Sequence, residues 1–259
     1  MRAQVRSASG EIAMARGDYA SARTHLEAAH KLGQELGAYA EGAFLVARLS
    51  EVAYRAGDAA NAERLLARAD EEADRYSVWD ARTYVRFLQA TLLLDRGEVA
   101  RAREVCDLAV GRVSDGTPPP VFRVVLGGLS ARISVAEGDP AAALPMVDEA
   151  LRTALAAGCT EQILGAQLEG AAEVLPALGQ ARPAAVLLAA ADAVRGLVPR
   201  SVPERSAVDA LAERLSAALP AADLAAARER GAALDGGRAA ALVAVLAGGE
   251  HEGGESAGE

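Results

Sequence analysis

Small and apolar residues recur along the chain with a period of 40 or 41 residues. Five glycines mark this period: Gly17, Gly57, Gly97, Gly138 and Gly179. An alanine stands five residues after each glycine and another stands twelve residues after it. An apolar residue stands nine residues after each glycine, and a small residue stands seven residues before it. Because these columns are filled in all five segments, the chain is predicted to consist of repeated structural units.

Each unit is predicted to be a pair of antiparallel helices. The glycine allows the left-handed backbone that ends the first helix, and the residue after it, often aspartate, caps the second helix. Ser77 with Asp80 is expected to cap the third unit, and Pro140 to open its helix at a first helical position. The predicted pairs are 3–16 with 19–36, 40–56 with 59–75, 78–95 with 99–113, 120–137 with 140–157, and 160–178 with 182–196.

Residues 197–247 are predicted to continue as helices without the repeat frame and to cap the array. Ser201 and Glu204 have the spacing of a capping box and start the first of these helices, and two shorter helices follow it. The chain is thus divided into five helix pairs over 1–196, the capping helices, and an acidic tail over 248–259. The tail is rich in Gly and Glu and is expected to be disordered.

The columns resemble those of the tetratricopeptide repeat, with the turn glycine near its fifteenth position. The resemblance implies an all-α fold in which the helix pairs stack into a right-handed α–α superhelix with a concave groove. The period is longer than the usual ~34 residues, and the aromatic residue common in the first helix is missing. Longer repeats of this kind are typical of the sensor regions of large bacterial transcription activators.

A second resemblance lies toward the C-terminus. Residues 184–195, 203–205, 213–219 and 239–242 are similar to the C-terminal end of actinobacterial regulators of the antibiotic-regulatory and large ATP-binding LuxR types. Those proteins join a DNA-binding domain and an ATPase to a helical-repeat sensor. This chain contains no phosphate-binding loop, and Lys31 is its only lysine. The resemblance implies the sensor or interaction part of a bacterial transcriptional regulator. The alternative is a stand-alone adaptor scaffold that assembles protein complexes.

Charge and composition narrow the function classes. The formal net charge is −9 and no arginine-rich stripe stands out, so direct binding of nucleic acid is disfavoured. The sequence has neither a signal-peptide core nor an apolar run of ~18 residues, which favours a cytoplasmic protein without membrane contact. The near-complete use of arginine over lysine is associated with GC-rich genomes, such as those of actinobacteria.

Catalysis and metal binding find little support in the residues. His25 and His30 lie five residues apart on one predicted helix and do not share a face, and together with His251 they are expected to be surface residues. Cys106 falls in the apolar column and is expected in the core, whereas Cys159 is expected to be partly exposed. No catalytic or metal-ligand motif is present. The chain is therefore expected not to be an enzyme and to need no cofactor or metal.

The candidate site is the groove lined by the first helices of the pairs. Seven of the nine aromatic residues lie between Tyr39 and Phe87. Together with Arg and Glu, they make a recognition patch for a protein, a peptide or a small effector, because they combine rigid area with directional polar groups. The alternative is that these rings only fill gaps between alanine-rich helices. The candidate groove residues are Phe44, Arg48, Glu51, Tyr54, Arg55, Tyr84, Phe87, Thr91, Arg132 and Glu169.

Two adjacent glycines stand inside the first helix of the fourth pair. Gly127 and Gly128 each cost ~1 kcal/mol in a helix interior relative to alanine. The pair therefore indicates either the close approach of a neighbouring helix or ligand, or simple slack in the packing.

Overall fold

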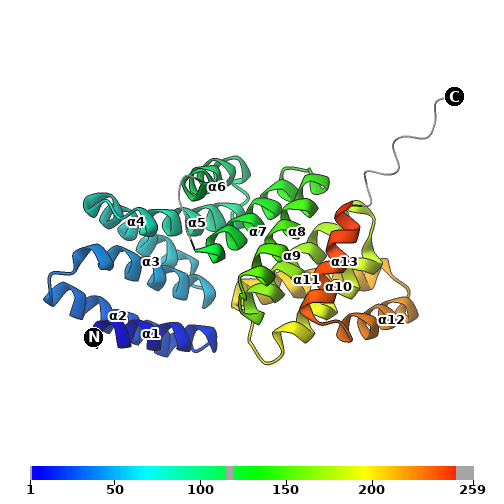
Figure 1. Cartoon of the computed structure of the whole chain (residues 1–259), viewed down its shortest axis with the longest axis horizontal. Coiled ribbons are helices and arrows are strands. Elements are labelled where there is room, and N and C mark those ends of the chain that lie inside the picture. Colours follow the sequence, from blue (N-terminus) through cyan, green and yellow to red (C-terminus); the bar gives the residue numbers. More distant parts are fainter. Residues whose placement is uncertain (1, 115–118, 249–259) are drawn as a thin grey trace. The chain divides into compact units, whose positions relative to one another are not determined.

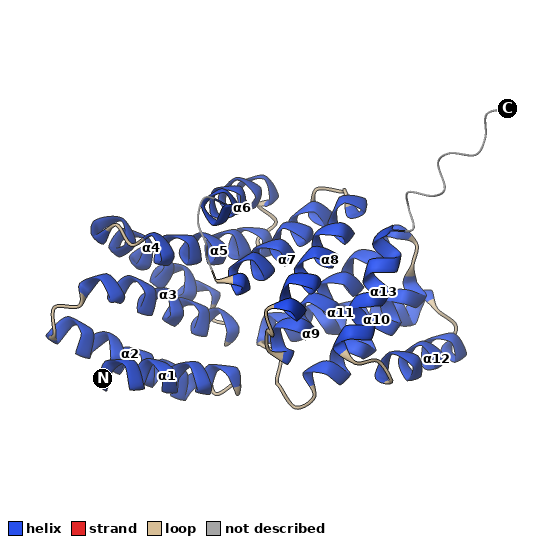
Figure 2. Ribbon diagram, in the orientation of Figure 1, coloured by secondary structure: helices blue, strands red, loops and turns tan. Residues whose placement is uncertain are grey.

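Helices account for all regular structure in the residues that the structure describes, 2–114 and 119–248 (Figures 1 and 2). A 3₁₀ turn, η1 (Leu175–Leu178), follows α9, and no strand occurs in these ranges. The all-α class is confirmed. The helices of this computed structural model are α1 (Arg2–Ala15), α2 (Tyr19–Glu35), α3 (Tyr39–Arg55), α4 (Ala59–Tyr76), α5 (Trp79–Asp95), α6 (Val99–Ser114), α7 (Pro120–Ala136), α8 (Pro140–Ala156), α9 (Glu161–Val174), α10 (Ala181–Arg195), α11 (Val202–Ala218), α12 (Ala221–Ala232) and α13 (Gly236–Gly248).

The turns inside the pairs have the predicted chemistry. All five frame glycines are left-handed, with φ between +73° and +87°. The carboxylates of Asp18, Asp58 and Asp139 each accept a hydrogen bond from the backbone N–H three residues on, at 3.0, 3.2 and 3.1 Å. Pro140 occupies the first turn of α8. A left-handed glycine thus ends the turn in all five pairs, and an aspartate caps the second helix in three of them. The predicted boundaries are accurate to about a residue at most of these turns.

The repeated small-residue columns form the packed interior of the pairs. None of the ten frame alanines is more than 3% exposed, and Cys106 is fully buried in the apolar column between them. An alanine at these points leaves room for the facing helix, and the larger residue fills the remaining space. The prediction that Cys106 belongs to the core is confirmed.

The junction between α4 and α5 differs from the prediction. Ser77 ends α4 in a left-handed conformation, with φ of 53°, and its N–H bonds to the Asp74 carbonyl. Val78 is the N-cap of α5 and makes no side-chain cap bond. The prediction that Ser77 caps the start of this helix is therefore wrong, and the side chain of Asp80, its predicted partner, lies outside what the structure describes. Because α4 continues to Tyr76, the residue that reverses the chain is Ser77 itself, so it terminates one helix instead of opening the next.

The chain divides into two compact units. The first unit comprises residues 1–115 with 198–207, and the second comprises 116–197 with 208–259. In the first unit, α2 and α4 each pack on the first helix of their own pair and on the first helix of the next pair. In the second unit, α7 pairs with α8, α9 pairs with α10, α12 packs on α10, and α13 packs on α8 and α9.

Residues 198–207, which the sequence groups with the capping helices, pack on the first unit. A Cβ atom at Gly17 would lie 2.8 Å from Cγ of Pro199, and one at Gly57 would lie 3.1 Å from Cγ1 of Val202. The segment therefore lies directly against the turns of the first two helix pairs.

In the second unit, neighbouring helices explain the two adjacent glycines of α7. A Cβ at Gly128 would lie 2.9 Å from the Nε2 atom of Gln167 on α9. A Cβ at Gly127 would lie 3.4 Å from the Cβ of Ala150 on α8. The close approach of helices, one of the two interpretations of this pair, is the one that the structure supports.

The histidines only partly follow the expectation of surface positions. His25 is half-buried, and its Nδ1 lies 3.2 Å from Nη1 of Arg6. His30 is 9% exposed and accepts a hydrogen bond at Nε2 from Arg68, at 2.8 Å, so its placement on the surface is wrong. Burial and the positive charge of Arg68 lower the pKa of His30 and keep the ring neutral. His251 lies outside the described residues.

Candidate functional site

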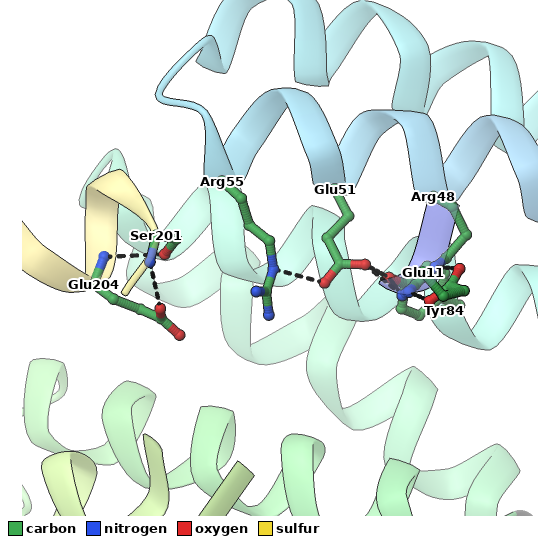
Figure 3. Close-up of polar contacts among 7 residues, drawn as sticks. All are labelled: Glu11, Arg48, Glu51, Arg55, Tyr84, Ser201 and Glu204. Carbon is green, nitrogen blue, oxygen red and sulfur yellow. Dashed lines mark hydrogen bonds and ion pairs between the residues drawn. The ribbon is translucent and has the colours of Figure 1, made fainter. Parts of the chain in front are cut away.

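Five polar side chains from three successive first helices meet in the first unit (Figure 3). We call this set the polar ladder. On α3 its members are three and four residues apart, so they share one face of the helix. The polar ladder consists of Glu11 on α1, Arg48, Glu51 and Arg55 on α3, and Tyr84 on α5.

Arg48 is the centre of the polar ladder. Its Nε donates to Glu11 Oε1 at 2.7 Å, and its Nη2 pairs with the other oxygen of Glu11. Its Nη1 donates to Glu51 Oε2 at 2.5 Å and to the Tyr84 hydroxyl at 2.7 Å. The Tyr84 hydroxyl in turn donates to Glu51, and Arg55 Nε donates to the second oxygen of Glu51 at 2.9 Å. Both carboxylate oxygens of Glu51 are thus engaged by the neighbouring side chains.

The centre of the polar ladder, at Glu51, is charged although it is buried. Glu51 is only 9% exposed and Tyr84 only 6%. Burial by itself would raise the pKa of Glu51, but the charges of Arg48 and Arg55 outweigh burial and lower this pKa. Burial raises the pKa of Tyr84 far above its usual value, so the hydroxyl stays protonated and can act as a hydrogen-bond donor. Charged groups that satisfy one another at low dielectric hold a fixed geometry.

Aromatic rings surround the buried hydroxyl. The ring centroids of Phe44 and Tyr84 are 5.4 Å apart and those of Tyr84 and Phe87 are 6.2 Å apart, while the Arg48 guanidinium lies 5.5 Å from the centre of the Tyr84 ring. Phe44 and Phe87 are half-buried, so each ring also presents area to solvent. We call the surface over these two helices the α3–α5 face. It consists of Phe44, Arg48, Glu51 and Arg55 of α3 with Tyr84, Phe87 and Thr91 of α5.

Residues 198–207 meet the polar ladder at Arg55. Figure 3 shows Ser201 and Glu204 beside this side chain. Burial alone would lower the pKa of Arg55, but the carboxylates of Glu51 and Glu204 outweigh it and raise this pKa. Ser201 N–H donates to Glu204 Oε2 at 2.8 Å and Glu204 N–H donates to Ser201 Oγ at 3.3 Å, which confirms the predicted capping box. Glu204 therefore caps α11 and also supplies a negative charge next to Arg55.

Two further predicted residues lie next to the polar ladder. The Tyr54 hydroxyl donates to Asp95 Oδ2 at 2.7 Å and so links α3 to α5. Thr91 is buried, and its hydroxyl donates to the carbonyl of Phe87 at 2.9 Å. Tyr54 thus adds a half-buried ring to this part of the surface, whereas the Thr91 side chain is turned back onto its own helix.

The remaining two predicted residues belong to the second unit. Arg132 is half-buried on α7. Glu169 is buried on α9 and forms an ion pair with Arg195 of α10, with 2.7 Å between Glu169 Oε1 and Arg195 Nε. The Arg195 side chain is itself only 2% exposed, so this pair is internal to the second unit.

Sequence reasoning missed two members of this site. Glu11 occupies the same frame position in the first pair as Glu51 does in the second, six residues before the turn glycine. Applying the frame to the first pair would have found it. Glu204 gives no such signal, because it approaches Arg55 from 149 positions further along the chain.

A separate cleft of about 400 Å³ lies in the first unit between α2, α3 and α4. None of the ten predicted site residues lines it. Its floor is apolar and its rim is charged with both signs, from Arg23, Glu27, Asp58 and Arg64. This mixture of charge gives the cleft no preference for a ligand of one sign.

Other reactive groups are sparse in the described part of the chain. Over 2–114 and 119–248, no group of three or more His, Cys, Asp or Glu residues is placed to hold a metal ion. In the same ranges, no helix is both long and apolar enough to cross a bilayer. Cys159 is partly buried, and burial raises the pKa of its thiol, which makes the thiolate scarcer at neutral pH.

Comparisons with known proteins do not indicate a function, so a function can be proposed only from the geometry described above. No family model, no curated protein and no solved structure matches the chain.

Proposed function

We propose that this chain is a non-enzymatic binding module and that its α3–α5 face holds a protein segment or a small effector. One observation carries the proposal: half-exposed aromatic rings surround a ladder of alternating Arg and Glu charges whose centre, Glu51, is buried. Phe44, Tyr54 and Phe87 supply apolar area, and Arg48 and Arg55 supply directional donors.

The physical basis is preorganisation. Binding hot spots combine large, rigid side chains with polar groups that are already fixed in place. In the polar ladder, Arg48 and Arg55 are held by carboxylates on α1 and α3. A ligand that meets this surface therefore loses little free energy in ordering its receptor.

We further propose the wider role that the sequence resemblance implies. The helix pairs within each unit follow the right-handed tetratricopeptide-like course, and the chain is the sensor or interaction part of a cytoplasmic bacterial transcriptional regulator. Ligand occupancy of the α3–α5 face would then shift the module between two curvatures, and other domains of the regulator would read this shift.

Substitution of the half-exposed rings tests the proposal. We expect Tyr54→Ala and Phe87→Ala each to reduce partner capture from the cytosol of the source organism at least tenfold, because loss of a hot-spot ring costs ~2 kcal/mol or more of binding free energy. The measurement is quantitative mass spectrometry of proteins and metabolites retained by the immobilised chain.

Matched variants separate binding from folding. Tyr39→Ala removes a ring that is 50% exposed at the opposite end of α3, and it should leave capture unchanged. Tyr54→Phe keeps the ring and removes the hydroxyl that donates to Asp95. Far-ultraviolet circular dichroism should show full helicity for every variant. Undiminished capture by both Tyr54→Ala and Phe87→Ala would remove the α3–α5 face from consideration.

A further inference from the structure

An apolar seam runs along the outer side of α1. Val5, Ala8, Ile12 and Ala15 are all exposed, Val5 by 60% and Ile12 by 55%. Their spacing of three, four and three residues places them in one line on the helix. Single exposed apolar residues are common on protein surfaces, but a line of four at helical spacing is the pattern of a helix that packs on another helix. We call these four residues the α1 seam.

The repeat frame shows what the same positions do in the other pairs. The position of Val5 is occupied by Leu45 in the second pair and by Val85 in the third, which are 8% and 0% exposed. The position of Ile12 is occupied by Val52 and Leu92, which are 3% and 6% exposed. Only the first pair leaves these two positions exposed within the first unit.

The covering element in the second pair is known. Leu45 and Val52 belong to one apolar cluster with Ala22, Leu26 and Ala29, which are residues of α2. The helix that buries these positions is therefore the second helix of the preceding pair. The third pair follows the same order, because α5 packs on α4.

The opposite side of α1 is already occupied. Gly10 and Met14 are buried, and a Cβ at Gly10 would lie 2.8 Å from Cγ of Leu26 on α2. Thus α1 packs on its own partner, α2, through one side, as α3 and α5 pack on their partners. The other side of α1 is exposed, whereas the same side of α3 and α5 packs on the preceding pair.

We propose that the α1 seam is a stacking surface for the second helix of a further helix pair that precedes α1 in the same polypeptide. The occupant would carry the small–large–small stripe of α2, in which alanines flank a leucine. A source in the same chain is favoured because both covering helices of the first unit, α2 and α4, are joined to the next helix by only two or three residues. The proposal goes beyond the proposed function and holds whether or not the α3–α5 face binds a ligand.

The test adds the proposed neighbour to the chain. A copy of residues 41–80 placed directly before residue 1 keeps the 40-residue frame and supplies the stripe of α4. We expect Ile12→Glu to shift the thermal midpoint of the present chain by about 2 °C at most, and to lower that of the extended protein by about 5 °C or more, since the site is then buried. Gln4→Glu, exposed on α1 but off the seam, should shift neither.

A second readout does not depend on the stability of the variant. An Ile12→Cys thiol should react with a maleimide at least tenfold more slowly in the extended protein than in the present chain. Equal labelling rates, or added helices that stay unfolded, would overturn the proposal. So would a dimer of the present chain that Ile12→Glu dissociates, because a second copy would then be the occupant. Loss of partner capture on Phe87→Ala is a separate readout and tests only the proposed function.

Discussion

Glu51→Gln is expected to lower the free energy of unfolding of the first unit by about 3–5 kcal/mol, the usual cost of removing one member of a buried ion pair. Glutamine has nearly the same shape, so the loss reflects charge. It would leave the partly buried Arg48 and Arg55 without the carboxylate that both of them contact. Unfolding in urea followed by far-ultraviolet circular dichroism measures this loss.

Two neighbouring variants serve as controls. Glu11→Gln should cost about 1 kcal/mol or less, because the Glu11 side chain is 40% exposed and exposed ion pairs contribute little. Tyr84→Phe removes only the hydroxyl that bridges Arg48 and Glu51, and it should cost about 1–2 kcal/mol. If Glu51→Gln cost no more than Glu11→Gln, the polar ladder would not be the element that fixes this surface.

The effect of Glu51→Gln on stability is expected to depend on pH. The folded chain lowers the pKa of Glu51 below the ordinary value of 4.5. The unfolded chain therefore binds this proton more readily, and the stabilisation by Glu51 is complete above about pH 5 and is lost as the pH falls through the lower, folded value. We expect the difference in unfolding free energy between the unmodified chain and Glu51→Gln to shrink below pH 4.5.

Gly231→Ala is expected to destabilise the second unit by about 3 kcal/mol, at the upper end of the cost of overpacking. A Cβ at Gly231 would lie 2.7 Å from the Cβ of Ala189 and closer still to the carbonyl oxygen of Val186. Both of these neighbours belong to α10, and a backbone oxygen cannot move aside as the end of a flexible side chain can. Thermal unfolding followed by circular dichroism measures the effect.

A second helical glycine of the same unit provides the comparison. A Cβ at Gly170 on α9 would meet nothing within 4 Å. Gly170→Ala should therefore stabilise the chain by about 0.5–1 kcal/mol, the difference in helix propensity. If Gly231→Ala behaved like Gly170→Ala, α10 and α12 would not approach as closely as described.

The repeat frame predicted most of the local structure, because it depends on chemistry within a few residues. Turn glycines, aspartate caps and buried alanines each follow from one position and its near neighbours. The frame also placed Phe44, Glu51 and Tyr84 on the inner side of their helices, and these three side chains do meet. It failed at Ser77, where two helix ends compete for the same residues and the longer α4 prevails.

The repeat frame could not predict contacts between segments that lie far apart in the sequence. The burial of His30 depends on Arg68 of the next pair. The pairing of Glu169 with Arg195, and the approach of Glu204 to Arg55, depend on how later helices pack. A charged residue at an inner position gives no sign of whether it faces a ligand or an internal partner of opposite charge.

Photo-cross-linking would show directly whether the α3–α5 face contacts the binding partner. A photoreactive derivative of phenylalanine, which keeps the ring, would replace Phe87 in one protein and Leu108, which is 56% exposed on α6, in another. After irradiation in the cytosol of the source organism, we expect a discrete cross-linked species from position 87 only, and its loss when Tyr54→Ala is added. Equal products from both positions, or a product from position 108 alone, would contradict the account.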